Sequence, residues 1–155
     1  MHLADFITLD RILPEMQSTG KQQAIAELAG LVCGGRSEEL CDEIARVLSD
    51  RERLASTAIG DEIAIPHGKL DGVSRLEIAL GRSRVGIDFE SVDGRPTRLF
   101  FVLVAPGDAT ALHLKALARI SRLCKEPLFR SQLLGAVSAE AMHGVLCAED
   151  AKFHT

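Results

Sequence analysis

The feature that most restricts the fold of this chain is an unbroken run of seven apolar residues, LFFVLVA, at positions 99–105. A run this short, rich in branched and aromatic side chains, favours a strand over a helix. A strand that is apolar on both faces lies inside a sheet covered by helices on each side. Pro106 and Gly107 end the run, and the loop after such a strand is where open α/β sheets place their sites. The run therefore predicts an α/β domain.

Helical patterns precede this strand in the sequence. Thr19 and Gln22 have the spacing of a capping box, and Gly34 ends the helix that they would start. Ser37 caps a second helix, with two glutamates in its first turn. Shorter alternating segments predict strands at residues 63–65 and 76–84, a short strand at 85–89, and an irregular lead-in or edge strand at 3–14.

Further helices are expected after the central strand. One begins at Asp108 or Thr110 and continues to about residue 125, Pro127 suits the first turn of another, and Ser138 caps a last one. The chain after Cys147 has no clear pattern and is expected to fray. With 155 residues, we expect one domain over residues 1–155, with an ordered core over about residues 3–147.

Charge and apolar pattern exclude several classes of protein. The formal net charge is −4, which does not favour a general nucleic-acid surface. No apolar run approaches the length of a membrane span, and the N-terminus lacks the charged and apolar regions of a signal peptide. The sequence contains no Trp or Tyr, so aromatic platforms for bases are absent too. These features predict a cytoplasmic protein without direct membrane insertion.

Four cysteines, Cys33, Cys41, Cys124 and Cys147, are scattered without paired spacing. Cys33 and Cys124 fall on the apolar faces of expected helices. This placement favours buried thiols over disulfides or a zinc site, so no metal site is predicted.

His67 has the most unusual local setting in the chain. It follows a short strand and lies between Pro66, which is expected to end that strand, and Gly68, which permits unusual backbone angles. An imidazole with an ordinary pKa of about 6.5 is mostly neutral at pH 7 and offers one lone pair. It could serve as a general base, a metal ligand or a nucleophile for a phosphoryl group. The plainer alternative is a turn histidine without a special role.

Other polar residues have both a functional and a plain interpretation. Arg51, Ser56 and Thr57 lie in the segment before the histidine strand; they could form a solvated helix end, or deliver a guanidinium and hydroxyls to charge at His67. His113 lies in the first turn of the helix after the central strand. It shares the inward stripe of that helix, so it is either a buried structural histidine or part of an anion site at a helix start.

Taken together, residues 51–60 (RERLASTAIG) and 63–69 (IAIPHGK) resemble the signature of enzyme IIA of the bacterial phosphotransferase system. The resemblance is to the fructose/mannitol type, and most closely to its nitrogen-regulatory branch. It extends through residues 81–83 (GRS), 86–89 (GIDF) and 93–94 (DG) and on to Pro106 and His113, so it covers nearly the whole chain. Ala55 stands where that branch usually has Gly, and Asp61 and Glu62 replace a smaller, often glycine-containing pair.

The resemblance implies a single α/β domain with a mixed sheet of about five strands between helices. It implies that His67 accepts a phosphoryl group, that His113 assists by hydrogen bonding, and that Arg51 shapes the site. The hydroxyls of Ser56 and Thr57 and the N–H groups near Gly68 could share the charge of the phosphoryl group. Phosphoryl transfer relies mainly on positioning and charge, so no cofactor is expected.

The resemblance also implies partners, and more than one function stays open. The leading hypothesis is a phosphocarrier that is loaded by a protein of the HPr or NPr type and regulates target proteins through its phosphorylation state. The alternative is a fructose- or mannitol-type component that passes phosphate to a separate enzyme IIB. A third possibility is a binding module that has lost phosphorylation. A hydrolase that uses the histidine pair has least support, because no carboxylate completes a triad.

Overall fold

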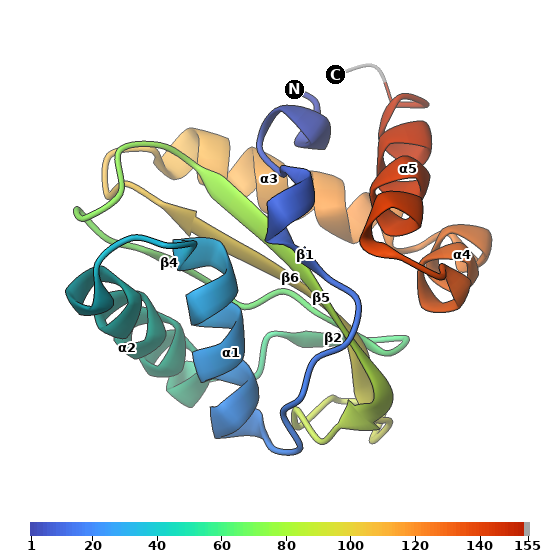
Figure 1. The fold of residues 1–155 in the computed structure, drawn as a ribbon, viewed down its shortest axis with the longest axis horizontal. Coiled ribbons are helices and arrows are strands. Elements are labelled where there is room, and N and C mark those ends of the chain that lie inside the picture. Colours follow the sequence, from blue (N-terminus) through green and yellow to red (C-terminus); the bar gives the residue numbers. More distant parts are fainter. Residues whose placement is uncertain (154–155) are drawn as a thin grey trace.

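The computed structural model describes residues 1–153 and has three layers, with a sheet between two groups of helices (Figure 1). Helices α1 and α2 cover one face of the sheet, and α3, α4 and α5 cover the other. The helices are α1 (Lys21–Cys33), α2 (Glu38–Leu54), α3 (Thr110–Leu123), α4 (Pro127–Gly135) and α5 (Ala139–Asp150), preceded by the 3-10 turns η1 (Leu3–Asp5) and η2 (Leu9–Arg11). The prediction of a single α/β domain is confirmed.

The sheet is mixed, and β6 lies at its centre. Its strands are β1 (Ile12–Leu13), β2 (Ala58–Gly60), β3 (Ile63–Ala64), β4 (His67–Lys69), β5 (Glu77–Ile87) and β6 (Thr97–Ala105). The order is β1-β5-β6-β3-β2, and β4 also pairs with β6. β5 runs antiparallel to β6, whereas β3 and β4 both run parallel to it. The apolar run therefore forms the central strand, as predicted.

Alternation along β6 divides the core into two parts. Leu99, Phe101 and Leu103 pack in the cluster that contains α3, α4 and α5. Phe100 and Val102 pack against α1 and α2 on the opposite face. Every side chain from residue 99 to residue 105 is at most 1% exposed, because each face of the strand meets a layer of helices.

The strand before His67 ends at Ala64, and a second strand begins at His67 directly after Pro66. β3 pairs with the first half of β6 and β4 with its second half, so the two segments form one interrupted strand. Proline lacks an N–H donor, but its carbonyl oxygen still accepts, and the Pro66 oxygen receives the Leu103 N–H at 3.0 Å. The ladder thus continues past the proline, and His67 is the first residue of a strand.

The expectation that the chain frays after Cys147 is wrong for residues 148–150, and residues 154 and 155 lie outside the described residues. Helix α5 continues to Asp150, whose side chain is 2% exposed. Its Oδ1 atom accepts from Arg119 Nε on α3 at 2.6 Å. The stabilising partner lies 31 positions away, so local periodicity could not indicate that this helix end is buried.

Two cysteines form a disulfide that the sequence pattern did not predict. Cys33 ends α1 and Cys41 lies in the first turns of α2, and their Cα atoms are 5.4 Å apart. The chain reverses at Gly34, whose φ of 67° is left-handed, and this reversal brings the two helix ends together. Cys124 is free and buried, and Cys147 is free and partly exposed.

The turn between β2 and β3 contains the Asp61–Glu62 pair that departs from the family pattern. Both residues are left-handed, with φ of 56° and 69°, which suits a tight hairpin turn. The Asp61 N–H donates to Asp93 Oδ2 at 3.0 Å, and Glu62 pairs with Arg95 at 2.9 Å. These contacts hold the turn in the geometry that glycine would otherwise adopt freely.

Candidate functional site

A cavity of about 590 Å³ lies where β4 meets the start of α3 and the end of α2. His67 begins β4 beside Leu103 of β6, and His113 is in the first turn of α3. The site thus occupies the C-terminal end of the parallel strands, where α/β sheets place ligands. The polar residues that line it are Asp50, Arg51, His67, Lys69, Thr110 and His113.

One hydrogen bond fixes the orientation of the His67 ring. Its Nδ1 atom lies 2.7 Å from the carbonyl oxygen of Ile65. Because a carbonyl oxygen only accepts, Nδ1 must carry the ring proton. The neutral ring therefore has its lone pair on Nε2, which makes Nε2 the nucleophilic atom.

The surroundings of His67 favour the neutral ring. Burial lowers its pKa below the ordinary value, and the positive charge of Arg51 acts in the same direction. The bond to Ile65 and the charge of Glu52 partly oppose this shift. The free lone pair is thus present at neutral pH.

His113 is a buried partner of His67. It is 5% exposed, and its ring centroid lies 5.4 Å from that of His67, edge to face. Burial lowers its pKa to about 4, helped by the charges of His67 and Lys69. No group among residues 1–153 hydrogen-bonds to its Nδ1 atom. Since a buried N–H without an acceptor is rare, we place the ring proton on Nε2.

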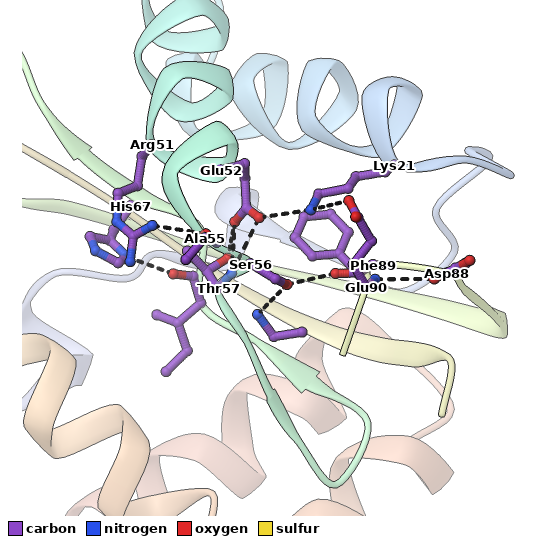
Figure 2. Close-up of polar contacts among 12 residues, drawn as sticks. Lys21, Arg51, Glu52, Ala55, Ser56, Thr57, His67, Asp88, Phe89 and Glu90 are labelled. Atoms are coloured by element: carbon purple, nitrogen blue, oxygen red, sulfur yellow. Dashed lines mark hydrogen bonds and ion pairs between the residues drawn. The ribbon is translucent and has the colours of Figure 1, made fainter. Parts of the chain in front are cut away.

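Arg51 is held at the edge of the cavity by the end of its own helix. Its Nη1 atom donates to the carbonyl oxygen of Ala55, the residue that caps α2, at 2.9 Å. In Figure 2 the guanidinium is drawn beside the His67 ring, and both line the same cavity. The structure therefore brings together His67, His113 and Arg51.

The hydroxyls of Ser56 and Thr57 do not reach this cavity. Ser56 Oγ donates to the Phe89 carbonyl at 2.6 Å, and the hydroxyl of Thr57 bonds to the buried carboxylate of Glu52 (Figure 2). Both hydroxyls hold the loop before β2. We therefore do not include them among the groups that would bind phosphate.

Gly68 lines the cavity, but the reason why this position requires glycine differs from the one expected. Its φ is not left-handed, so backbone freedom is not required. A Cβ at this position would lie 2.4 Å from Val47 Cγ1, which is far too close for packing. Glycine thus lets α2 approach β4, and this approach brings Arg51 near His67. A role for its N–H in binding phosphate stays a prediction.

Sequence reasoning missed three polar residues that line the cavity, Asp50, Lys69 and Thr110. Lys69 Nζ donates to Thr110 Oγ1 at 3.1 Å, across the cavity mouth from β4 to α3. A strand places residues two apart on one side, so the spacing of His67 and Lys69 was the signal that could have identified the lysine. The sequence suggests Asp108 or Thr110 as a helix cap, but the N-cap of α3 is Ala109 and no side chain of the described residues caps it.

Acid should destabilise the fold through His113. In the unfolded chain this ring takes up a proton near pH 6.5, but in the folded chain only near pH 4. Between these values the unfolded state binds more protons, so stability falls as the pH drops from about 6.5 to about 4, by up to about 3 kcal/mol. Urea unfolding of wild type and His113→Gln across this range measures the effect, and the variant should lose this part of the slope. The control is His143→Gln, which lies on α5 outside the cavity; equal slopes in wild type and His113→Gln would contradict the assignment.

No helix formed by residues 1–153 combines the length and apolar character needed to cross a membrane. Within the same residues, no three His, Cys, Asp or Glu side chains are grouped to hold a metal ion.

Comparison with known proteins agrees with this geometry. Residues 5–148 match the family model described as "Phosphoenolpyruvate-dependent sugar phosphotransferase system, EIIA 2". A nitrogen regulatory protein of Bradyrhizobium diazoefficiens is 40% identical over 148 residues, which are 94% of this chain and 95% of the relative. A fructose-specific EIIABC component of Bacillus subtilis is 36% identical over 97% of this chain but only 24% of its own length.

Solved structures show the same fold. The crystal structure of nitrogen regulatory protein IIA-Ntr from Neisseria meningitidis superposes with a TM-score of 0.86 and 30% identity, over 93% of this chain and 98% of that one. The mannitol IIA of Escherichia coli gives a TM-score of 0.76 at 21% identity, over 90% of this chain and 97% of that one. With the family model matching almost its full length, the chain belongs to the EIIA 2 family of the phosphoenolpyruvate-dependent sugar phosphotransferase system.

Proposed function

We propose that Nε2 of His67 accepts a phosphoryl group from a phosphohistidine carrier of the HPr or NPr type and later passes it on or returns it. The observation that carries the proposal is the 2.7 Å bond from His67 Nδ1 to the Ile65 carbonyl, which leaves the lone pair on Nε2. Membership of a phosphotransferase family supports a transfer role.

The transfer step uses groups already at the cavity. The Nε2 lone pair forms a bond to phosphorus while the bond from phosphorus to the donor nitrogen breaks, and that electron pair returns to the donor. The His67 ring keeps its Nδ1 proton and becomes positively charged. Arg51 and the Nε2–H of His113 would stabilise the phosphoryl oxygens. The step balances without a metal, an oxidant or an organic cofactor.

We further propose that the phosphorylation state of His67 regulates target proteins. Relatives named nitrogen regulatory protein, from Bradyrhizobium diazoefficiens and Pseudomonas aeruginosa, align over 94% of this chain and 95% of their own length. A second candidate is transfer to a separate enzyme IIB for sugar uptake. It is supported by a fructose-specific EIIA component of Haloferax volcanii, 36% identical over 89% of this chain.

We place the protein in the cytoplasm, because phosphoenolpyruvate, the phosphate source in the family description, is made inside cells. The Cys33–Cys41 disulfide argues against this placement, since disulfides are rare in reducing compartments such as the cytoplasm.

The test is phosphorylation in vitro. The protein is incubated with phosphoenolpyruvate, enzyme I and an HPr- or NPr-type carrier, and its intact mass is read at neutral pH. We expect one added phosphoryl group that is lost in acid and is absent from His67→Gln. No gain of mass with any carrier would refute the relay and leave a binding module. Adding a fructose-type enzyme IIB then separates the two functions, because only the transport component should pass its phosphate on.

A further inference from the structure

A buried carboxylate lies behind the site, outside the cavity. The side chain of Glu52, at the end of α2, is 2% exposed. Lys21 Nζ, from the start of α1, lies 3.1 Å from its Oε2 atom. The N–H of Thr57 lies 3.2 Å from both carboxylate oxygens, and the Thr57 hydroxyl donates to Oε1. A buried charge needs such partners, and here they belong to two different segments.

A short series of hydrogen bonds connects this carboxylate to the catalytic ring. The carbonyl of Thr57, whose N–H is held by Glu52, accepts the N–H of Ile65 at 3.0 Å. The carbonyl of Ile65 in turn accepts from His67 Nδ1 at 2.7 Å. Figure 2 shows Glu52, Thr57 and His67 of this series near the end of α2. Two residues, Thr57 and Ile65, therefore connect Glu52 to the imidazole through their backbone N–H and C=O groups.

The charge of Glu52 also bears on the ring. Burial and Arg51 lower the pKa of His67, while Glu52 raises it. Arg51 and Glu52, which are neighbours at the end of α2, therefore have opposite effects on the pKa of the ring. During transfer the ring becomes positive, and its Nδ1–H bond to Ile65 strengthens with that charge. A fixed carboxylate nearby stabilises this state more than the neutral ring.

From this arrangement we propose that Glu52, held by Lys21, is a positioning residue for phosphoryl transfer. It fixes the Thr57 and Ile65 peptides, which keep the His67 proton on Nδ1 and Nε2 free for phosphorus. It also offsets the effect of Arg51 on the charged ring. This inference rests on the proposed phosphorylation of His67, but its first test does not require phosphorylation.

The first test is the tautomer of His67, read from the ¹⁵N chemical shifts of its ring in the unphosphorylated protein. Wild type should show a protonated Nδ1 and a bare Nε2. In Glu52→Gln the Nδ1–H fraction should fall, and the pKa of His67 should move further down because an opposing negative charge is removed. The matched control is Glu90→Gln, which takes one carboxylate from the same lysine (Lys21 Nζ to Glu90 Oε1, 2.9 Å) without touching Thr57.

The second test is the rate of phosphoryl uptake at saturating carrier. Misplacement of a reacting group by about 1 Å can cost about 100-fold in rate. We therefore expect Glu52→Gln to lose about 10- to 100-fold in the maximal rate, with little change in the carrier concentration needed for half-saturation. Glu90→Gln should stay within about twofold of wild type on the same scale.

The outcomes separate the two proposals. A folded Glu52→Gln with wild-type ring shifts and rate would overturn the role of Glu52 while His67 phosphorylation stands. If wild type takes up no phosphate, the proposed function fails, and the ring shifts alone decide the effect of Glu52. If Glu52→Gln does not fold, the wild-type spectrum still decides: a proton on Nε2 rather than Nδ1 would refute the positioning.

Discussion

Arg51→Gln is expected to slow phosphoryl uptake by His67 about 100-fold, because one preorganised charged donor is typically worth that much in a transfer step. The guanidinium lies at the cavity that holds His67 and is kept there by the Ala55 carbonyl at 2.9 Å. Glutamine removes the permanent charge and the pair of parallel donors that suits phosphate oxygens. The fold should remain intact, since within residues 1–153 Arg51 bonds only to the end of its own helix and makes no buried ion pair.

The measurement is the initial rate of mass gain with a fixed amount of phosphorylated carrier. Arg53→Gln is a matched control from the same helix end, because Arg53 pairs with Asp50 at 2.5 Å and its side chain is 72% exposed. It should phosphorylate at the wild-type rate. A second readout is the pKa of His67, which Arg51 lowers and which should therefore rise in Arg51→Gln alone. Equal rates for the two variants would reduce Arg51 to a surface residue.

Arg82→Met is expected to cost about 3 to 5 kcal/mol of unfolding free energy, because it leaves several buried carbonyl groups unpaired. Arg82 lies on β5 and is fully buried. Its Nε donates to the Pro14 carbonyl at 3.1 Å, and Nη1 donates to the carbonyls of Leu133 and Ala136 at 2.8 and 2.6 Å. One side chain thus joins the lead-in chain, the sheet and the end of α4.

Denaturant unfolding at pH 7 measures this loss. The matched control is Arg84→Met, two residues along the same strand, where the guanidinium pairs with Glu15 at 2.8 Å and the side chain is 57% exposed. That exposed pair should contribute less than about 1 kcal/mol. Against a typical total of about 5–15 kcal/mol, the loss at Arg82 could prevent folding at body temperature. A change at Arg82 no larger than that at Arg84 would contradict this account.

Local patterns predicted the helices and the longer strands but not β2 or β4. The capping box expected at Thr19 and Gln22 does not form, because Gly20 is the N-cap of α1 and no side chain within residues 1–153 caps it. The apolar run predicted the central strand, Ser37 and Ser138 were identified as caps, and each accepts an N–H three residues on in the structure. Pro127 begins α4 as expected. These features depend on neighbours within a few residues, and that range is what periodicity and capping rules describe.

Features that join distant segments were not predicted. The buried pair of Arg119 with Asp150 and the disulfide between Cys33 and Cys41 each required the fold to bring their partners together. The continuation of the ladder past Pro66 also depended on a carbonyl acceptor facing Leu103, which no property of the proline itself reveals.

The sequence alone was enough to identify the family and to single out His67, His113 and Arg51, because these residues lie in stretches with a specific order of residue types. Only the tertiary structure decided which groups meet at the cavity. It placed Lys69 and Thr110 there, turned Ser56 and Thr57 toward other partners, and connected Glu52 to the ring through the backbone groups of two residues. The physical reason is that a hydroxyl or carboxylate bonds to whichever partner the packed backbone brings within about 3 Å. In this protein those partners come from segments that are far apart in the chain.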